Sequence, residues 1–123
     1  MRLLSIYFVI LTFLSFNPWV RPDSGQAISN IAWDKIDHAA AYCLFSLLFM
    51  SAYRCHKQRW AVSFIGLLSC SLAGVLLEYC QLWFTSTRQF SYHDAIANAL
   101  GAAVGVILFW CYSFVAVKRV SQL

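Results

Sequence analysis

Four long apolar segments divide this chain of 123 residues and constrain its fold more than any other feature. They cover residues 3–20, 36–53, 60–84 and 95–117. A helix needs roughly 17–25 apolar residues to cross about 30 Å of hydrocarbon, and each segment has that length. Membrane-spanning strands would need only about 10 residues with alternating polarity, and the sequence has no such alternation. We therefore predict an all-α fold, a four-helix transmembrane bundle.

The composition supports this prediction, because 61% of the residues are apolar and only 11% are charged. Soluble domains carry about 25% charged residues on average. The length suits one domain, so we expect residues 1–123 to form a single membrane domain. No small-x-small cleavage site follows the first segment, and we expect that segment to be retained as a span.

Basic residues are concentrated on one side of the predicted spans. With four spans, both termini share a side with the central loop, and that side carries only basic charges: Arg2, Arg54, Lys57, Arg59, Lys118 and Arg119. All the carboxylates fall on the opposite side. The positive-inside rule therefore predicts cytoplasmic amino and carboxyl termini. The net charge of +4 reflects this topology, and without a nucleic-acid-binding motif we expect no nucleic-acid partner.

Polar residues recur at one predicted membrane depth in the second, third and fourth segments. They form sets spaced by three or four residues: Asp34, His38 and Tyr42; Glu78 and Gln81; Asp94 and Asn98. This spacing places each set on one helix face. Polar groups that find no water in lipid must pair with one another, so these faces should converge. The sequence therefore predicts a polar pocket that opens outward, with apolar residues between it and the cytoplasm.

Gly101 and Gly105 form a GxxxG pattern in the last segment. Such a pattern lets another helix backbone approach closely. Two interpretations stay open. The glycines pack the fourth helix against the second or third and close the pocket, or they serve ordinary packing or a homo-oligomer.

An ordered series of motifs lies between residues 34 and 105, and it reads DKIDHAAAY, EYCQ, a single arginine, SYHDAIAN and GAAVG. This series resembles the pattern of the VanZ-like family of small bacterial membrane proteins. The matching residues are Asp34, Lys35, His38, Tyr42, Glu78, Gln81, Arg88, Asp94, Asn98, Gly101 and Gly105. The stretch TSTRQF departs from the pattern, because it lacks a Pro/Gly-type turn before the arginine.

The resemblance implies a multi-pass protein of the bacterial cytoplasmic membrane. The family takes its name from a protein linked to low-level resistance to teicoplanin, a lipoglycopeptide that acts on the cell envelope. The resemblance therefore implies an envelope role and a contribution to such resistance. It implies no reaction.

The first interpretation of the pocket is binding of an envelope lipid headgroup or a lipid-linked glycan, with membrane lipids as partners. Lys35 and Arg88 would hold a phosphate. His38 would act as general acid or base if a reaction occurs, with Glu78 and Asp34 beside it. The remaining predicted ligand-binding residues are Tyr42, Gln81, Asp94 and Asn98. The sequence has no clear nucleophile, so enzymatic activity stays open.

Three other interpretations compete with this one. The charges could serve only to lock the helices, although buried pairs stabilise little relative to apolar replacements. A small transporter is less favoured, because the polar residues stop halfway along the predicted spans. A divalent metal could bind His38, Glu78, Asp94 or His93, but the spacing is not dense, so we predict no metal site and no cofactor.

Overall fold

The computed structural model describes residues 2–16, 27–55, 57–84 and 91–120, with side chains described for all of these except 27–34 and 116–120. Within these ranges the chain forms helices and no strand. The helices are α1 (Arg2–Phe16), α2 (Ala27–Ala52), α3 (Arg59–Phe84) and α4 (Tyr92–Val120). The prediction of an all-α fold is confirmed.

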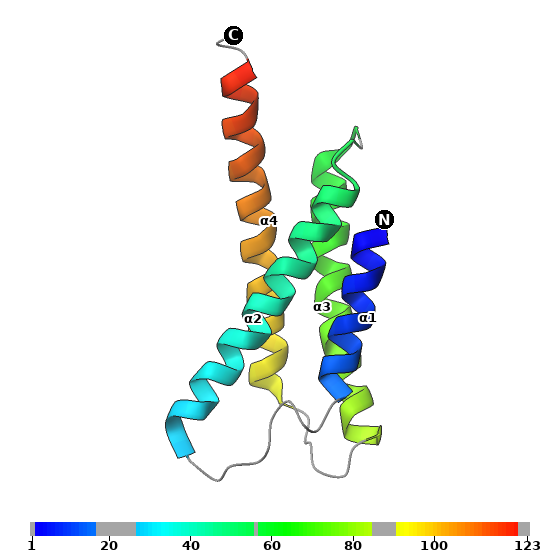
Figure 1. Ribbon diagram of the computed structural model, residues 1–123, viewed down its shortest axis with the longest axis vertical. Coiled ribbons are helices and arrows are strands. Elements are labelled where there is room, and N and C mark those ends of the chain that lie inside the picture. Colours follow the sequence, from blue (N-terminus) through cyan, green and yellow to red (C-terminus); the bar gives the residue numbers. More distant parts are fainter. Residues whose placement is uncertain (1, 17–26, 56, 85–90, 121–123) are drawn as a thin grey trace.

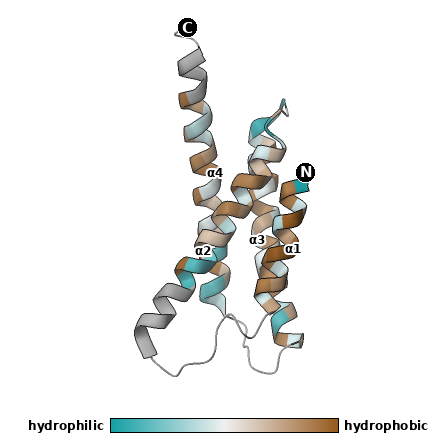
Figure 2. Ribbon diagram, viewed as in Figure 1, coloured by the Kyte–Doolittle hydropathy of each residue, from teal (hydrophilic) through white to brown (hydrophobic). Residues whose placement is uncertain are grey.

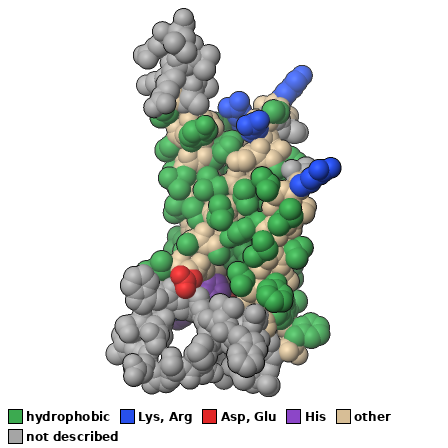
Figure 3. All heavy atoms as spheres, in the orientation of Figure 1, with side chains coloured by type: hydrophobic (Ala, Val, Ile, Leu, Met, Phe, Trp, Pro, Cys, Tyr) green, Lys and Arg blue, Asp and Glu red, His purple; other side chains and the backbone are tan. Residues whose placement is uncertain are grey.

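Successive helices run in opposite directions, so their ends gather at two ends of the molecule (Figure 1). The start of α1, the end of α4 and the turn between α2 and α3 lie at one end. We call it the basic end, because Arg54, Lys57 and Arg59 are exposed there. The opposite end, where α3 finishes and α4 begins, is called the site end. On the face drawn in Figure 3, acidic and histidine side chains lie toward the site end and Lys and Arg side chains toward the basic end.

The second helix begins well before its predicted start at residue 36, because α2 already starts at Ala27. Residues 27–35 contain neither proline nor glycine, so nothing in the sequence interrupts the helix there. His38 consequently lies inside the helix, about three turns from its beginning. The polar residues are therefore held by a regular backbone and not by a loop.

The fourth helix also starts earlier than predicted, at Tyr92. Ser91 caps it, since the Asp94 backbone N–H donates to the Ser91 hydroxyl over 3.3 Å. The helix continues to Val120, beyond the predicted end at residue 117. The third helix agrees with its prediction to within one residue, whereas the predicted end of the first, at residue 20, lies outside the described residues.

The closest contact in the bundle is the crossing of α2 and α4, which pack together more extensively than any other pair. A methyl group at Gly101 would overlap the backbone carbonyl of Ala39, and one at Gly105 would overlap the Ser46 hydroxyl and the Cys43 carbonyl. Only glycine permits this approach. The GxxxG face thus packs against α2 of the same chain, and a homo-oligomer through Gly101 and Gly105 stays a prediction.

The first helix packs against α2 through aromatic side chains. The Tyr7 hydroxyl donates to the Ala41 carbonyl over 2.9 Å. Phe8 stacks on Phe45 with ring centroids 5.7 Å apart. This contact adds α1 to the core, whose buried members are Leu11, Tyr42, Phe45, Cys70, Leu77 and Ala102.

Hydrophobic residues predominate in the middle of the helices, and hydrophilic residues lie toward the two ends (Figure 2). Phe64, Leu68, Leu72 and Leu76 follow one another at helical spacing along an exposed face of α3. By contrast, several polar side chains are buried inside the bundle: Ser46, Ser63, Glu78, Gln81 and Asn98. By length and hydropathy, α3 and residues Tyr92–Val115 of α4 could each cross a membrane. Apolar surface around a polar interior is what a lipid environment requires.

Candidate functional site

Three helices bring ionisable side chains together near the site end. His38 of α2, Glu78 of α3 and Asp94 of α4 each offer a nitrogen or oxygen atom, and these three atoms lie within 4.8 Å of one another. Glu78 is only 3% exposed, whereas the other two side chains are partly buried. Glu78 lies six residues before the end of α3, so it is about 9 Å along the axis from that end at 1.5 Å per residue. The cluster therefore lies inside the bundle, close to its site end.

Lys35 forms the charged rim of this cluster. Its ammonium group lies 3.3 Å from Oδ1 of Asp94, and the two side chains are 33% and 14% exposed. Asp94 also lies in the first turn of α4, where the helix dipole favours a negative charge. Lys35 is thus anchored on one side and still open to solvent or to an anion on the other.

The imidazole of His38 is oriented by Asn98. His38 Nδ1 lies 3.1 Å from Asn98 Oδ1. An amide oxygen can only accept, so Nδ1 carries the proton and donates it. In the neutral tautomer with the proton on Nδ1, a lone pair stays on Nε2, where it can accept a proton or bind a cation.

Gly74 makes room for this arrangement, and the sequence analysis did not identify it. A Cβ atom at Gly74 would lie 2.9 Å from Asn98 Nδ2 and 3.2 Å from Tyr42 Cε1. The absence of a side chain therefore lets Asn98 and Tyr42 pack directly on α3. The only sequence signal is position: Gly74 precedes Glu78 by four residues and shares its helix face.

Other predicted site residues lie elsewhere or are not described. Gln81 Nε2 donates to the Ser15 carbonyl over 3.0 Å, so this amide ties α3 to α1. Tyr42 is buried beside Gly74 and contributes an aromatic wall. Arg88 and the side chain of Asp34 lie outside the described residues.

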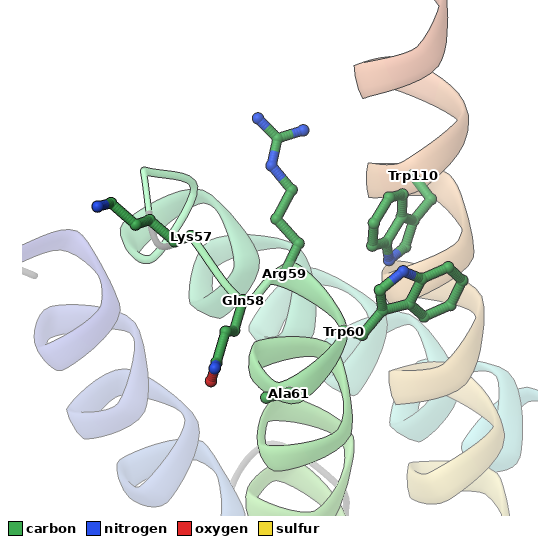
Figure 4. Close-up of a pocket in the computed structure, with 6 residues that line it drawn as sticks. All are labelled: Lys57, Gln58, Arg59, Trp60, Ala61 and Trp110. Carbon is green, nitrogen blue, oxygen red and sulfur yellow. The ribbon is translucent and has the colours of Figure 1, made fainter.

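A separate open pocket of about 460 Å³ lies at the basic end, between α3 and α4 (Figure 4). The rings of Trp60 and Trp110 stack with centroids 4.8 Å apart. Trp110 Nε1 donates to the Ser63 hydroxyl over 2.9 Å, which fixes the pair. The residues that line the pocket are Lys57, Gln58, Arg59, Trp60, Ala61 and Trp110. Tryptophan beside exposed lysine and arginine is typical of a membrane–water interface.

The two ends therefore differ in chemistry. The cluster at the site end combines the ammonium group of Lys35, the oriented imidazole of His38 and the carboxylates of Glu78 and Asp94. Such a set can bind an anion at Lys35, transfer a proton at His38, or bind a cation between the carboxylates. The described residues of the basic end form an interfacial surface with exposed cations and stacked tryptophans.

Comparison with known proteins identifies the family of this chain. The model of the family described as VanZ/LLP1 matches residues 2–115. No curated protein and no solved structure matched the chain. Together with the two long apolar helices, the family match indicates a membrane protein. It covers nearly the whole chain and includes the polar cluster, so the resemblance seen in the motifs is confirmed: this chain belongs to the VanZ/LLP1 family.

Proposed function

We propose that this protein crosses the bacterial cytoplasmic membrane four times, with both termini in the cytoplasm. The site would then bind the phosphate of an envelope lipid headgroup or a lipid-linked glycan from the outer side. The observation that carries this proposal is the convergence of Lys35, His38, Glu78 and Asp94 at one end of the bundle. The four residues come from three helices, far from the exposed cations of the basic end.

The distribution of charge supports the topology. Exposed Arg54, Lys57 and Arg59 mark the basic end, and the positive-inside rule places such an end in the cytoplasm. The 26 residues of α2 are about 39 Å long at 1.5 Å per residue, enough to span the bilayer with tilt. Figure 1 shows α2 inclined against α4, as a long span with tilt requires.

Lys35 supports the choice of an anionic ligand. Its ammonium group is one-third exposed, and one face of it is held by Asp94. A lysine anchored in this way presents a point charge without losing all its hydration, which suits a phosphate. Arg88 would add a bidentate contact. Asn98 would orient His38, Tyr42 would line the site, and Gln81 would hold α3 against α1. If chemistry follows binding, His38 would be the acid or base, with Glu78 and Asp34 as partners.

Native mass spectrometry of the protein extracted with its lipids tests this function. We expect a phosphate-containing lipid bound to the wild-type chain, and much lower occupancy in the Lys35→Ala variant. Lys57→Ala removes an exposed lysine at the basic end and serves as the matched control, with wild-type occupancy. Equal lipid occupancy in the two variants, or none in the wild type, would remove the proposal.

Family membership extends the proposal to the cell. We propose that lipid or glycan binding contributes to resistance against teicoplanin-type glycopeptides, which act on the same envelope. Deletion of the gene should lower the inhibitory concentration of teicoplanin, and complementation should restore it. Complementation by Lys35→Ala should fail.

The alternative function is structural, as a scaffold whose polar groups only lock the helices. Several bonds between helices favour it: Tyr7 to Ala41, Lys35 to Asp94, His38 to Asn98 and Gln81 to Ser15. A purely structural protein would retain no specific lipid in the same mass spectra. Transport fits less well, because the core beyond the cluster contains the apolar side chains of Phe45, Met50 and Cys70.

A further inference from the structure

We propose that His38, Glu78 and Asp94 form a binding site for a divalent transition-metal ion of the Zn²⁺, Mn²⁺ or Fe²⁺ class. Their donor atoms come from three different helices and lie within 4.8 Å of one another. Three atoms no more than 4.8 Å apart share a point within 4.8/√3, about 2.8 Å, of all three. Metal–ligand bonds to these donors are about 2.0–2.2 Å long, so small side-chain rotations would complete the site. This proposal departs from the prediction from sequence that no metal binds.

The donor set selects the class of ion. One imidazole nitrogen and two carboxylate oxygens suit zinc, manganese and ferrous iron. Calcium and magnesium prefer oxygen donors alone, and the imidazole of His38 does not suit them. Three protein ligands also leave coordination positions for water or for an oxygen of a phosphate.

A residue outside the three ligands gives separate support. Histidine ligands commonly donate their second ring N–H to a fixed acceptor, which orients the ring and raises its basicity. Asn98 Oδ1 is such an acceptor for His38 Nδ1. Asn98 is 1% exposed and packs on Gly74, so it cannot readily turn away. With Nδ1 held by Asn98, Nε2 is the ring nitrogen that would bind the ion.

The charges of the cluster also favour a bound cation. Glu78 is almost fully buried between apolar helices, where an ionised carboxylate is costly unless it is compensated. The ammonium group of Lys35 lies 3.3 Å from Asp94. A divalent ion would add positive charge beside the carboxylates of Glu78 and Asp94. The loaded site would then also attract an anion, although metal binding itself does not depend on the proposed lipid.

Metal analysis of the purified full-length protein in detergent provides the test. The protein is stripped with a chelator, equilibrated with Zn²⁺ or Mn²⁺, freed of unbound ion and analysed by inductively coupled plasma mass spectrometry. We expect one ion per wild-type chain. His38→Gln, Glu78→Gln and Asp94→Asn should each weaken binding by at least about tenfold, the lower bound known for supporting residues.

Two exposed residues of the same types serve as matched controls. His93→Gln in α4 and Asp37→Asn in α2 should keep wild-type affinity. Pulsed electron paramagnetic resonance of Mn²⁺ on the wild-type chain should detect one imidazole nitrogen, a readout that does not depend on how the variants fold. A wild-type chain that binds no ion, a spectrum without nitrogen coupling, or full binding by His38→Gln would overturn the proposal.

The same samples separate this inference from the proposed function. Lipid occupancy is measured on the chelator-stripped protein, and metal binding on delipidated protein. If lipid binds and metal does not, only the metal site is rejected. If metal binds and no lipid does, only the lipid function is rejected.

Discussion

His38 in α2 donates a hydrogen bond to Asn98 in α4 over 3.1 Å, and this bond joins the two helices at the polar cluster. Asn98 is 1% exposed, so water cannot readily take its place. Asn98→Ala should cost about 1–3 kcal/mol, because the partly buried imidazole N–H of His38 loses this acceptor. The apparent unfolding temperature in detergent should fall. Leu100→Ala, which truncates an exposed residue of the same helix, provides the comparison, and an equal fall in both would contradict this role.

The crossing of α2 and α4 predicts a sharp response at Gly105. A methyl group there would overlap the Ser46 hydroxyl and the Cys43 carbonyl. Gly105→Ala should therefore destabilise the protein by about 1–3 kcal/mol, as overpacking of a tight contact does. Thermal unfolding in detergent measures this, with Val104→Ala on the exposed neighbouring position as control.

A second variant tests the cause of that effect. Adding Ser46→Ala to Gly105→Ala removes the overlapping hydroxyl and leaves the Cys43 carbonyl in place. We expect part of the lost stability to return. If the double variant is less stable than Gly105→Ala, the overlap with Ser46 is not the cause.

Much of this architecture follows from hydropathy and spacing. The four apolar segments correspond to the four helices of the described residues, because a helix satisfies the backbone polar groups of an apolar segment within the segment itself. The spacing of Glu78 and Asp94 from the segment ends places them at a similar distance from the site end. The sequence indicates the position of a residue along the helix axis, because the rise of a helix per residue is fixed.

The sequence does not indicate which neighbouring helix a side chain contacts. Gln81 shares a helix face with Glu78, yet its amide donates to the Ser15 carbonyl of α1. Which helix a face meets depends on the packing of all the helices, and helical spacing carries no information on it. For the same reason the spacing does not indicate the role of Gly74, which follows from its contact with Asn98.

The predicted start of the second helix, at residue 36, was wrong for a different reason. Residues 27–33 include serine, asparagine and tryptophan, and they lie outside the apolar segments that predict helices. Helix propensity differs little among such residues, by less than about 1 kcal/mol each, and no proline or glycine interrupts them. Hydropathy marks the part of a helix that lies in lipid, and a helix can continue beyond it.

The proposed topology predicts opposite labelling at the two ends. Cys55 is exposed in the turn between α2 and α3, and His93 is exposed at the start of α4. In intact cells a membrane-impermeant maleimide should label His93→Cys in a Cys55→Ser background. The wild-type Cys55 should react only after the membrane is permeabilised. The reverse pattern would place the site end in the cytoplasm.

The contact between α1 and α2 predicts a moderate effect at Tyr7. Tyr7→Phe keeps the ring and removes the hydroxyl that donates to the Ala41 carbonyl. The loss should be about 0.5–1.5 kcal/mol, the usual net value of one hydrogen bond. Unfolding in detergent should report it, with Tyr112→Phe on the exposed face of α4 unchanged. No difference between the two variants would mean that this bond does not stabilise the docking of α1.

Glu78→Gln separates a functional carboxylate from a structural one. Glutamine keeps the size of the side chain and one acceptor oxygen, and it removes a charge that is costly to bury. If the carboxylate acts on a ligand, the variant should reach wild-type abundance in the membrane and fail to restore teicoplanin resistance in a deletion strain. Immunoblots of the membrane fraction and inhibitory concentrations measure the two quantities on the same cells. Asp37→Asn, at an exposed position of α2, should leave both unchanged. Loss of the Glu78→Gln protein from the membrane would favour the helix-locking alternative, because a carboxylate that holds the helices together is needed for folding even without a ligand.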